Sequence, residues 1–175
     1  TTLFNLAMED GQDSEPGSFA NVGGLLYFSA NDGTNGAELW KSNGTSAGTV
    51  MVRSIRGGSA GSAPLNLTAV GGTLFFTAND GSHGVELWKT DGTPSGTMMV
   101  RDIRVGSGSA DPANLTNVGG TLYFTVNGEQ LWKSDGTSAG TVQVKPIQGS
   151  ASLAAPSHLV NVGGVLYFTA AYHQL

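Results

Sequence analysis

The chain has 175 residues, a formal net charge of −5 and no cysteine, which excludes disulfides, thiol nucleophiles and thiolate metal sites. Its eight lysines and arginines do not cluster, and no apolar run reaches the roughly 18 residues of a membrane-spanning helix. We therefore expect neither a nucleic-acid partner nor membrane insertion. The 27 glycines recur at regular positions, which is typical of turns rather than of disorder.

An internal repeat dominates the sequence. The segment from Val70 to Arg104 has a close copy that starts at Val22, a shorter copy that starts at Val118 and a last fragment that starts at Val162. The spacing between successive starts is 48, 48 and 44 residues. A fixed period in this range predicts a repeat architecture, here as a single domain over residues 1–175.

Each repeat predicts four short strands, best seen in the second repeat. Pro64 to Val70 is a short alternating run, and a Gly-Gly turn connects it to the apolar run Leu74 to Ala78, which we expect to be buried on both faces. Val85 to Thr90 and Thr97 to Ile103 follow, each after a turn rich in Gly, Asp and Asn. No stretch has a sustained helical period with caps. The pattern therefore predicts one antiparallel meander sheet per repeat.

Copies of these strands follow in chain order. The first strand of each repeat ends at Val22, Val70, Val118 and Val162. The third strand is expected at Glu38–Lys41, Glu86–Lys89 and Gln130–Lys133, with a short remnant at 173–175. The fourth strand is expected at Thr49–Ile55, Thr97–Ile103 and Thr141–Ile147.

The third repeat is four residues shorter than the others. The whole deletion falls between the second and third strands, where Asn127-Gly128 replaces a six-residue loop. Asn-Gly is the favoured pair for a two-residue type I′ hairpin turn. The deletion is therefore the one that a true hairpin would tolerate.

Four-stranded repeats of this length predict an all-β fold, a four-bladed β-propeller built from four-stranded antiparallel meander sheets. Thr1 to Leu6 aligns with the fourth strands, so residues 1–21 would complete the last blade and then begin the first. Pairing this N-terminal strand with the C-terminal blade would close the ring and remove an open sheet edge. The alternative is a half-ring that joins a second chain to make eight blades. The expected oligomeric state is therefore either a monomeric ring or a dimer of half-rings.

A family resemblance rests on Glu86-Leu87-Trp88 in register with Asp91-Gly92-Thr93, a pattern present in all three full repeats. The pattern resembles the ELWxxDGT repeats of bacterial secreted and cell-surface proteins. The first copy has Asn43 in place of Asp, and the third has Gln130 in place of Glu. The resemblance implies a propeller-like module that is secreted or on the cell surface. It implies no activity and no ligand.

Aromatic and histidine side chains are the candidate ligand-binding residues. Indole rings stack on sugars, but Trp40, Trp88 and Trp132 recur once per repeat in a strand that must pack against its neighbour, so blade packing is the competing interpretation. His158 stands where two other repeats have Asn66 and Asn114, and we expect it to face a central channel.

Carboxylates in the turns are the candidate metal ligands. Calcium binds oxygen-rich loops, but each loop here offers only one or two carboxylates, and Asp also caps its own turn. Calcium is therefore the one candidate cofactor. The candidate ligands are Asp32, Asp80, Asp91 and Asp135. Basic residues on the fourth strands, at Arg53, Arg101 and Lys145, are expected to guard the sheet edge.

These patterns favour a non-catalytic extracellular recognition module that binds a glycan or a surface protein through loops or grooves between blades. A purely structural cell-surface repeat is one alternative, and a glycan-active hydrolase or lyase that uses His158 is another. No nucleophile elbow or unique catalytic set is evident, so the sequence does not establish an enzyme.

Overall fold

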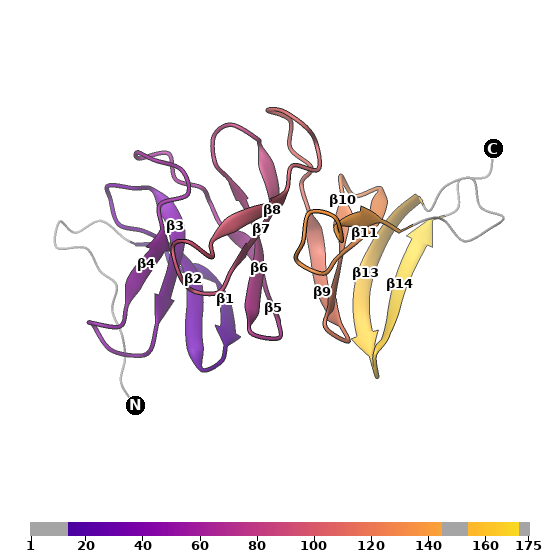
Figure 1. The fold of residues 1–175 in the computed structure, drawn as a ribbon, viewed down its shortest axis with the longest axis horizontal. Coiled ribbons are helices and arrows are strands. Elements are labelled where there is room, and N and C mark those ends of the chain that lie inside the picture. Colours follow the sequence, from indigo (N-terminus) through magenta and orange to yellow (C-terminus); the bar gives the residue numbers. More distant parts are fainter. Residues whose placement is uncertain (1–13, 145–153, 172–175) are drawn as a thin grey trace.

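The computed structural model describes residues 14–144 and 154–171, which form four antiparallel sheets and no helix (Figure 1). The first sheet contains β1 (Gly17–Val22), β2 (Leu25–Asn31), β3 (Ala37–Ser42) and β4 (Val50–Arg53). The second contains β5 (Leu65–Val70), β6 (Thr73–Asn79), β7 (Val85–Thr90) and β8 (Met98–Arg101). The third contains β9 (Ala113–Val118), β10 (Thr121–Val126), β11 (Gln130–Ser134) and β12 (Val142–Gln143). The last contains β13 (Ala154–Val162) and β14 (Val165–Ala171).

The strand order confirms the meander prediction. In the first three sheets, each strand pairs only with the strands next to it in the chain, as hairpins require. The last sheet has two strands in the described part of the chain. The strands expected at Thr1–Leu6 and 173–175 lie outside the described residues, as does Lys145.

The short hairpin of the third repeat has the predicted turn. Asn127 and Gly128 both adopt left-handed backbone conformations, with φ of 51° and 67°. The Glu129 N–H donates a hydrogen bond of 3.1 Å to the Val126 carbonyl. Two central residues with positive φ define a type I′ turn, which is why Asn-Gly can replace the longer loop here.

The sheets pack face to face in chain order. The first strands of successive sheets contact one another, β1 with β5, β5 with β9, and β9 with β13. One apolar core lies between the first and second sheets and another between the second and third. Within each of these sheets the same Phe–Trp pair recurs on the second and third strands: Phe28 with Trp40, Phe76 with Trp88, and Phe124 with Trp132. The repeated pairing explains why the second and third sheets present the same packing surface to the sheet before them.

Lysine and arginine side chains also join the first sheet to the second and the second to the third. The Nζ of Lys41 donates to the Gly92 carbonyl at 2.8 Å, and Lys89 repeats the bond to Gly136 at 2.7 Å. On the edge strands β4 and β8, the Nη1 of Arg53 donates to the Thr97 carbonyl at 2.6 Å, and Arg101 makes the equivalent bond at 2.8 Å. The arginines are on edge strands, as predicted, but they bond to the turn of the following repeat.

The described residues do not form a closed ring. The first sheet and the last sheet lie at opposite ends of the molecule (Figure 1). The expected closing segment, Thr1 to Leu6, is outside the described residues. The four-bladed ring that it would close therefore stays a prediction.

Two leucines of the second sheet test how far stability depends on packing between sheets. Leu74 is 1% exposed in the first core, whereas Leu65 is 55% exposed. We expect Leu74→Ala to lower the free energy of unfolding by about 2–5 kcal/mol, because a cavity replaces the buried side chain. Leu65→Ala should lower it by less than about 1 kcal/mol. Urea unfolding at one fixed protein concentration measures both, and equal losses would contradict the packing model.

Candidate functional site

A bulge interrupts the first strand of every repeat at the same position. The pairing register shifts by one residue there in all four sheets. The bulged residue is left-handed each time, at Ser18, Asn66, Asn114 and His158, with φ of 52°, 56°, 55° and 52°. Asn and His are among the side chains that tolerate this conformation best. Bulges of this kind redirect a side chain and often lie next to binding sites.

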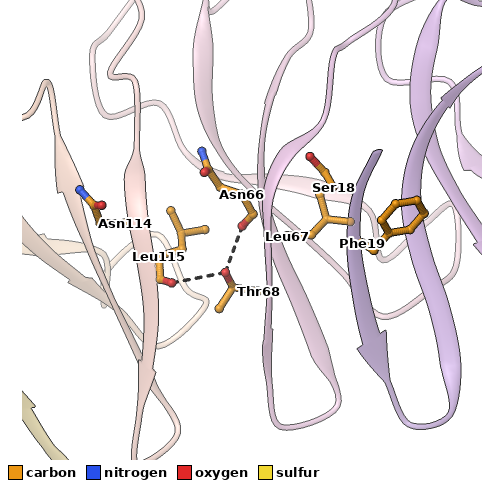
Figure 2. A pocket seen from close by; sticks show the side chains of 7 residues that line it. All are labelled: Ser18, Phe19, Asn66, Leu67, Thr68, Asn114 and Leu115. Atoms are coloured by element: carbon orange, nitrogen blue, oxygen red, sulfur yellow. Dashed lines mark hydrogen bonds between the residues drawn. The ribbon is translucent and has the colours of Figure 1, made fainter. Parts of the chain in front are cut away.

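The first three bulges border a concave site across three sheets, which we name the first-strand hollow. The hollow has a volume of about 430 Å³ and crosses β1, β5 and β9. Figure 2 shows Phe19 at one end, Asn114 at the other and Asn66 between them. Its lining is uncharged and consists of Ser18, Phe19, Asn66, Leu67, Thr68, Asn114 and Leu115.

Two amide side chains give the hollow its hydrogen-bonding capacity. The Nδ2 of Asn114 donates to Thr125 Oγ1 at 3.1 Å, and the Nδ2 of Asn66 donates to the Pro112 carbonyl at 3.3 Å. Neither Oδ1 atom accepts a hydrogen bond within the described part of the chain. Both residues are exposed, so these oxygens can accept hydrogen bonds from a ligand.

An aromatic ring and a fixed hydroxyl complete the lining. Phe19 is 59% exposed, although its ring also lies 6.2 Å from that of Phe28. The Thr68 hydroxyl bonds to the carbonyls of Asn66 at 3.0 Å and Leu115 at 3.5 Å (Figure 2). The site thus combines an apolar ring with neutral polar groups on one surface.

The three tryptophans lie apart from the first-strand hollow. Trp88 is 6% exposed and belongs to the core between the first two sheets. Trp40 and Trp132 are half-buried, and the Nε1 of Trp132 donates to Gln130 Oε1 at 3.1 Å. Trp132 packs against the second core. This placement fits blade packing, and the Trp88 indole is not open to a sugar.

His158 has the backbone conformation of the equivalent asparagines, but it does not line the hollow. Its side chain is exposed, and Nδ1 lies 3.1 Å from Thr169 Oγ1. The expected equivalence with Asn66 and Asn114 is therefore seen in the backbone. The hollow itself involves the first three repeats only.

The four candidate calcium ligands each bond to their own turn. Asp91 and Asp135 accept hydrogen bonds from the following Thr93 and Thr137, from hydroxyl and backbone N–H alike, and these bonds lower the pKa of both carboxyls. Asp32 accepts bonds from the backbone of Thr34 and Asn35. In the residues that the structure describes, no three His, Asp or Glu side chains gather as a metal site.

Asp80 and His83 form an ion pair within one turn. Asp80 Oδ2 lies 2.7 Å from His83 Nδ1, and Asp80 also accepts the backbone N–H groups of Ser82 and His83. Burial raises the pKa of Asp80, but the hydrogen bond from the His83 ring and the backbone bonds outweigh it, so the pKa falls below 3.8. The same side-chain hydrogen bond raises the pKa of His83 above 6.5.

Two glutamates of the repeated motif are fully buried, which sequence reasoning missed. Glu38 accepts hydrogen bonds from Ser62 Oγ and from the backbone N–H groups of Ile55 and Arg56. Glu86 accepts the equivalent backbone bonds from Ile103 and Arg104, at 3.0 and 3.2 Å. Burial raises the pKa of both carboxyls. A raised carboxyl pKa can mark a catalytic acid, but these oxygens anchor the end of the fourth strand.

A search against protein-family models and a search of curated proteins both found no match to this chain. The similarity to ELWxxDGT repeats is therefore still a prediction from the motif. No helix in the described residues is long and apolar enough to span a membrane.

The Asp80–His83 pair predicts a measurable change in the His83 pKa. Asp80→Asn removes the negative charge that stabilises the imidazolium, so the His83 pKa should fall toward 6.5. Titration of the imidazole signals by NMR measures the pKa, and Asp135→Asn, in a different turn, serves as the control. An unchanged pKa in Asp80→Asn would show that the pair does not form in solution.

Burial of Glu86 predicts a pH-dependent stability. Because its pKa in the folded protein is raised above 4.5, the folded state holds a proton that the unfolded state has lost. The stability contributed by Glu86 is full below about pH 4.5 and declines as the pH rises through the raised pKa. Glu86→Gln should remove this decline, so the wild type should lose stability relative to the variant as the pH rises.

Urea unfolding at several pH values between 4.5 and 8 measures this difference. The matched control is Glu129→Gln, since Glu129 is exposed. Parallel stability curves for wild type and Glu86→Gln would contradict the raised pKa.

Proposed function

We propose that this chain is a non-catalytic recognition module that binds a neutral glycan in the first-strand hollow. The observation that carries this proposal is the combination, in one concave surface, of an exposed Phe19 ring with the free amide oxygens of Asn66 and Asn114. Its volume, about 430 Å³, is within the roughly 300–1,000 Å³ of small-molecule sites.

The chemistry of the lining matches a sugar. Sugar hydroxyls donate to amide oxygens, and the apolar face of a pyranose ring stacks on an aromatic ring. Because the lining is uncharged, it offers no ion pair to a phosphate, a sulfate or a charged peptide. The left-handed backbone at the bulges holds the amides in place before a ligand arrives, which lowers the entropic cost of binding.

The repeat architecture supports the assignment of the sheets as β-propeller blades. Each four-stranded meander stacks on the next, and the first strands lie side by side along the series. First strands of this kind would lie nearest the axis of a propeller. The motif resemblance supports a secreted or cell-surface location.

A structural repeat is the second candidate. The observation in its favour is the identical set of bonds between sheets, since Lys41 and Lys89 contact equivalent turns. A hydrolase or lyase has less support, because the described lining of the hollow has no carboxylate and no histidine.

Binding of the labelled protein to a glycan array, followed by calorimetric titration of the best ligand, tests the proposal. Asn66→Gly with Asn114→Gly should weaken binding by about tenfold or more, because two acceptors are lost. Glycine adopts positive φ freely, so this variant keeps the backbone of the bulges. Phe19→Ala should weaken binding roughly fivefold to tenfold through loss of stacking.

Val105→Ala, at an exposed loop position, is the control and should bind as the wild type does. The absence of any array signal would favour the structural repeat. Binding that the glycine variant does not weaken would place the ligand elsewhere on the molecule.

A further inference from the structure

The outer face of the last sheet is apolar and exposed. Val160 pairs with Tyr167 and Val162 pairs with Val165, so these four side chains share one face of the sheet. Each is about half exposed or more, and Tyr167 is 56% exposed. We name this surface the last-sheet face. Contiguous apolar side chains on a sheet surface mark an interaction site.

The internal repeats show what covers this face. Tyr27 and Phe75 occupy the position of Tyr167 in the first two repeats, and each is only 3% exposed. Tyr27 packs in a core with Leu74 and Phe76 of the following sheet, and Phe75 packs with Leu122 and Phe124 of the sheet after it. A neighbouring sheet that presents a leucine and a phenylalanine is thus the natural cover for this face.

The first sheet presents that complementary surface at the other end of the molecule. Leu26 occupies the position of Leu74 and Leu122, but it is 40% exposed while they are buried. Phe28 and Trp40 share its face, because Phe28 is two residues on in the same strand and pairs with Trp40. Phe28 is itself 1% exposed, so Leu26 and the half-buried Trp40 form the accessible part of this face. We name this surface the first-sheet face. The two faces lie at opposite ends of the described structure, so they do not cover each other (Figure 1).

We propose that the last-sheet face docks on the first-sheet face of a second copy of this chain. The contact repeats the packing already present between the sheets within one chain, with Tyr167 placed as Tyr27 and Phe75 are and Leu26 placed as Leu74 is. Such head-to-tail contacts close into a ring when the rotation allows it. Two copies that dock reciprocally give a ring of eight sheets. This inference does not depend on glycan binding.

The oligomeric state of the full chain tests the docking. Analytical ultracentrifugation over a range of concentrations should show a dimer of the 17.9 kDa chain. Tyr167→Glu and Leu26→Glu should each shift the protein toward monomer, because each places a charge in the apolar contact. The control Val105→Glu, in an exposed loop, should leave the dimer unchanged.

Mixing the two variants separates head-to-tail docking from other contacts. Leu26→Glu keeps an intact last-sheet face and Tyr167→Glu keeps an intact first-sheet face, so an equimolar mixture should regain association that neither variant shows alone. A larger oligomer that both substitutions dissociate also supports the docking, because head-to-tail contacts that do not close into a ring give an open chain of copies. A wild type that is monomeric at all concentrations overturns the proposal, as does association that only one substitution weakens.

Cysteine crosslinking gives a test that does not depend on a disruptive charge. The chain has no cysteine, so Leu26→Cys and Tyr167→Cys each introduce one defined thiol. A short bismaleimide should link the two variants to each other when they are mixed. The pair Leu26→Cys and Val105→Cys should give no product. Failure of the first pair to link, with circular dichroism showing both variants folded, overturns the proposal.

Discussion

The structure depends on the stacking of each sheet against the next. A single four-stranded meander of this kind has two faces that carry apolar side chains and cannot bury either one alone. The two cores lie between sheets rather than within one, and the Phe–Trp pair on the second and third strands gives the second and third sheets the same surface toward the preceding sheet. Lys41 and Arg53 add bonds to the following repeat, so sheet spacing and turn position are linked.

The first-strand hollow follows from this stacking. Because the first strands lie side by side, a bulge in each one brings the redirected side chains of Asn66 and Asn114 to a common surface. The Nδ2 of Asn66 also bonds to the carbonyl of Pro112, which precedes β9 of the next sheet, so the bulge contributes to packing as well as to the hollow. Asn66 thus links two successive repeats and leaves its amide oxygen free for a ligand, whereas the Asn114 amide bonds within its own sheet, to Thr125.

Periodicity and turn residues were enough to predict much of the fold. The third strand of the second repeat was expected at Val85 to Thr90 and has those bounds, because its alternation ends at clear Gly and Asp signals. The fourth strand was expected at Thr97 to Ile103 but is shorter, Met98 to Arg101. Thr97 instead bonds through its hydroxyl to Thr90, and the Ile103 N–H donates to the buried Glu86. A pattern of apolar residues does not predict these tertiary hydrogen bonds, so it does not predict where the strand ends.

The candidate site was less accessible to sequence reasoning. The shared position of His158 with Asn66 and Asn114 was evident from the repeat, and the recurrence of residue types that tolerate left-handed backbone was the available signal. The hollow was missed because the exposure of Phe19 depends on how the sheets stack. The tryptophans are candidate ligand-binding residues because they are aromatic, yet Trp88 pairs with the buried Phe76 and lies in the core.

The repeated bond from a lysine to the glycine turn of the next unit also bears on how such a chain can change length. Lys41 donates to the Gly92 carbonyl and Lys89 donates to the Gly136 carbonyl. The second unit therefore contains both the glycine that accepts a bond from the preceding unit and the lysine that donates one to the following unit. Duplication or loss of one 48-residue unit inside the gene would leave every remaining junction chemically complete. Growth by tandem duplication therefore requires no new kind of contact, and units that keep the same motif residues, such as those at Val22 and Val70, are the expected result.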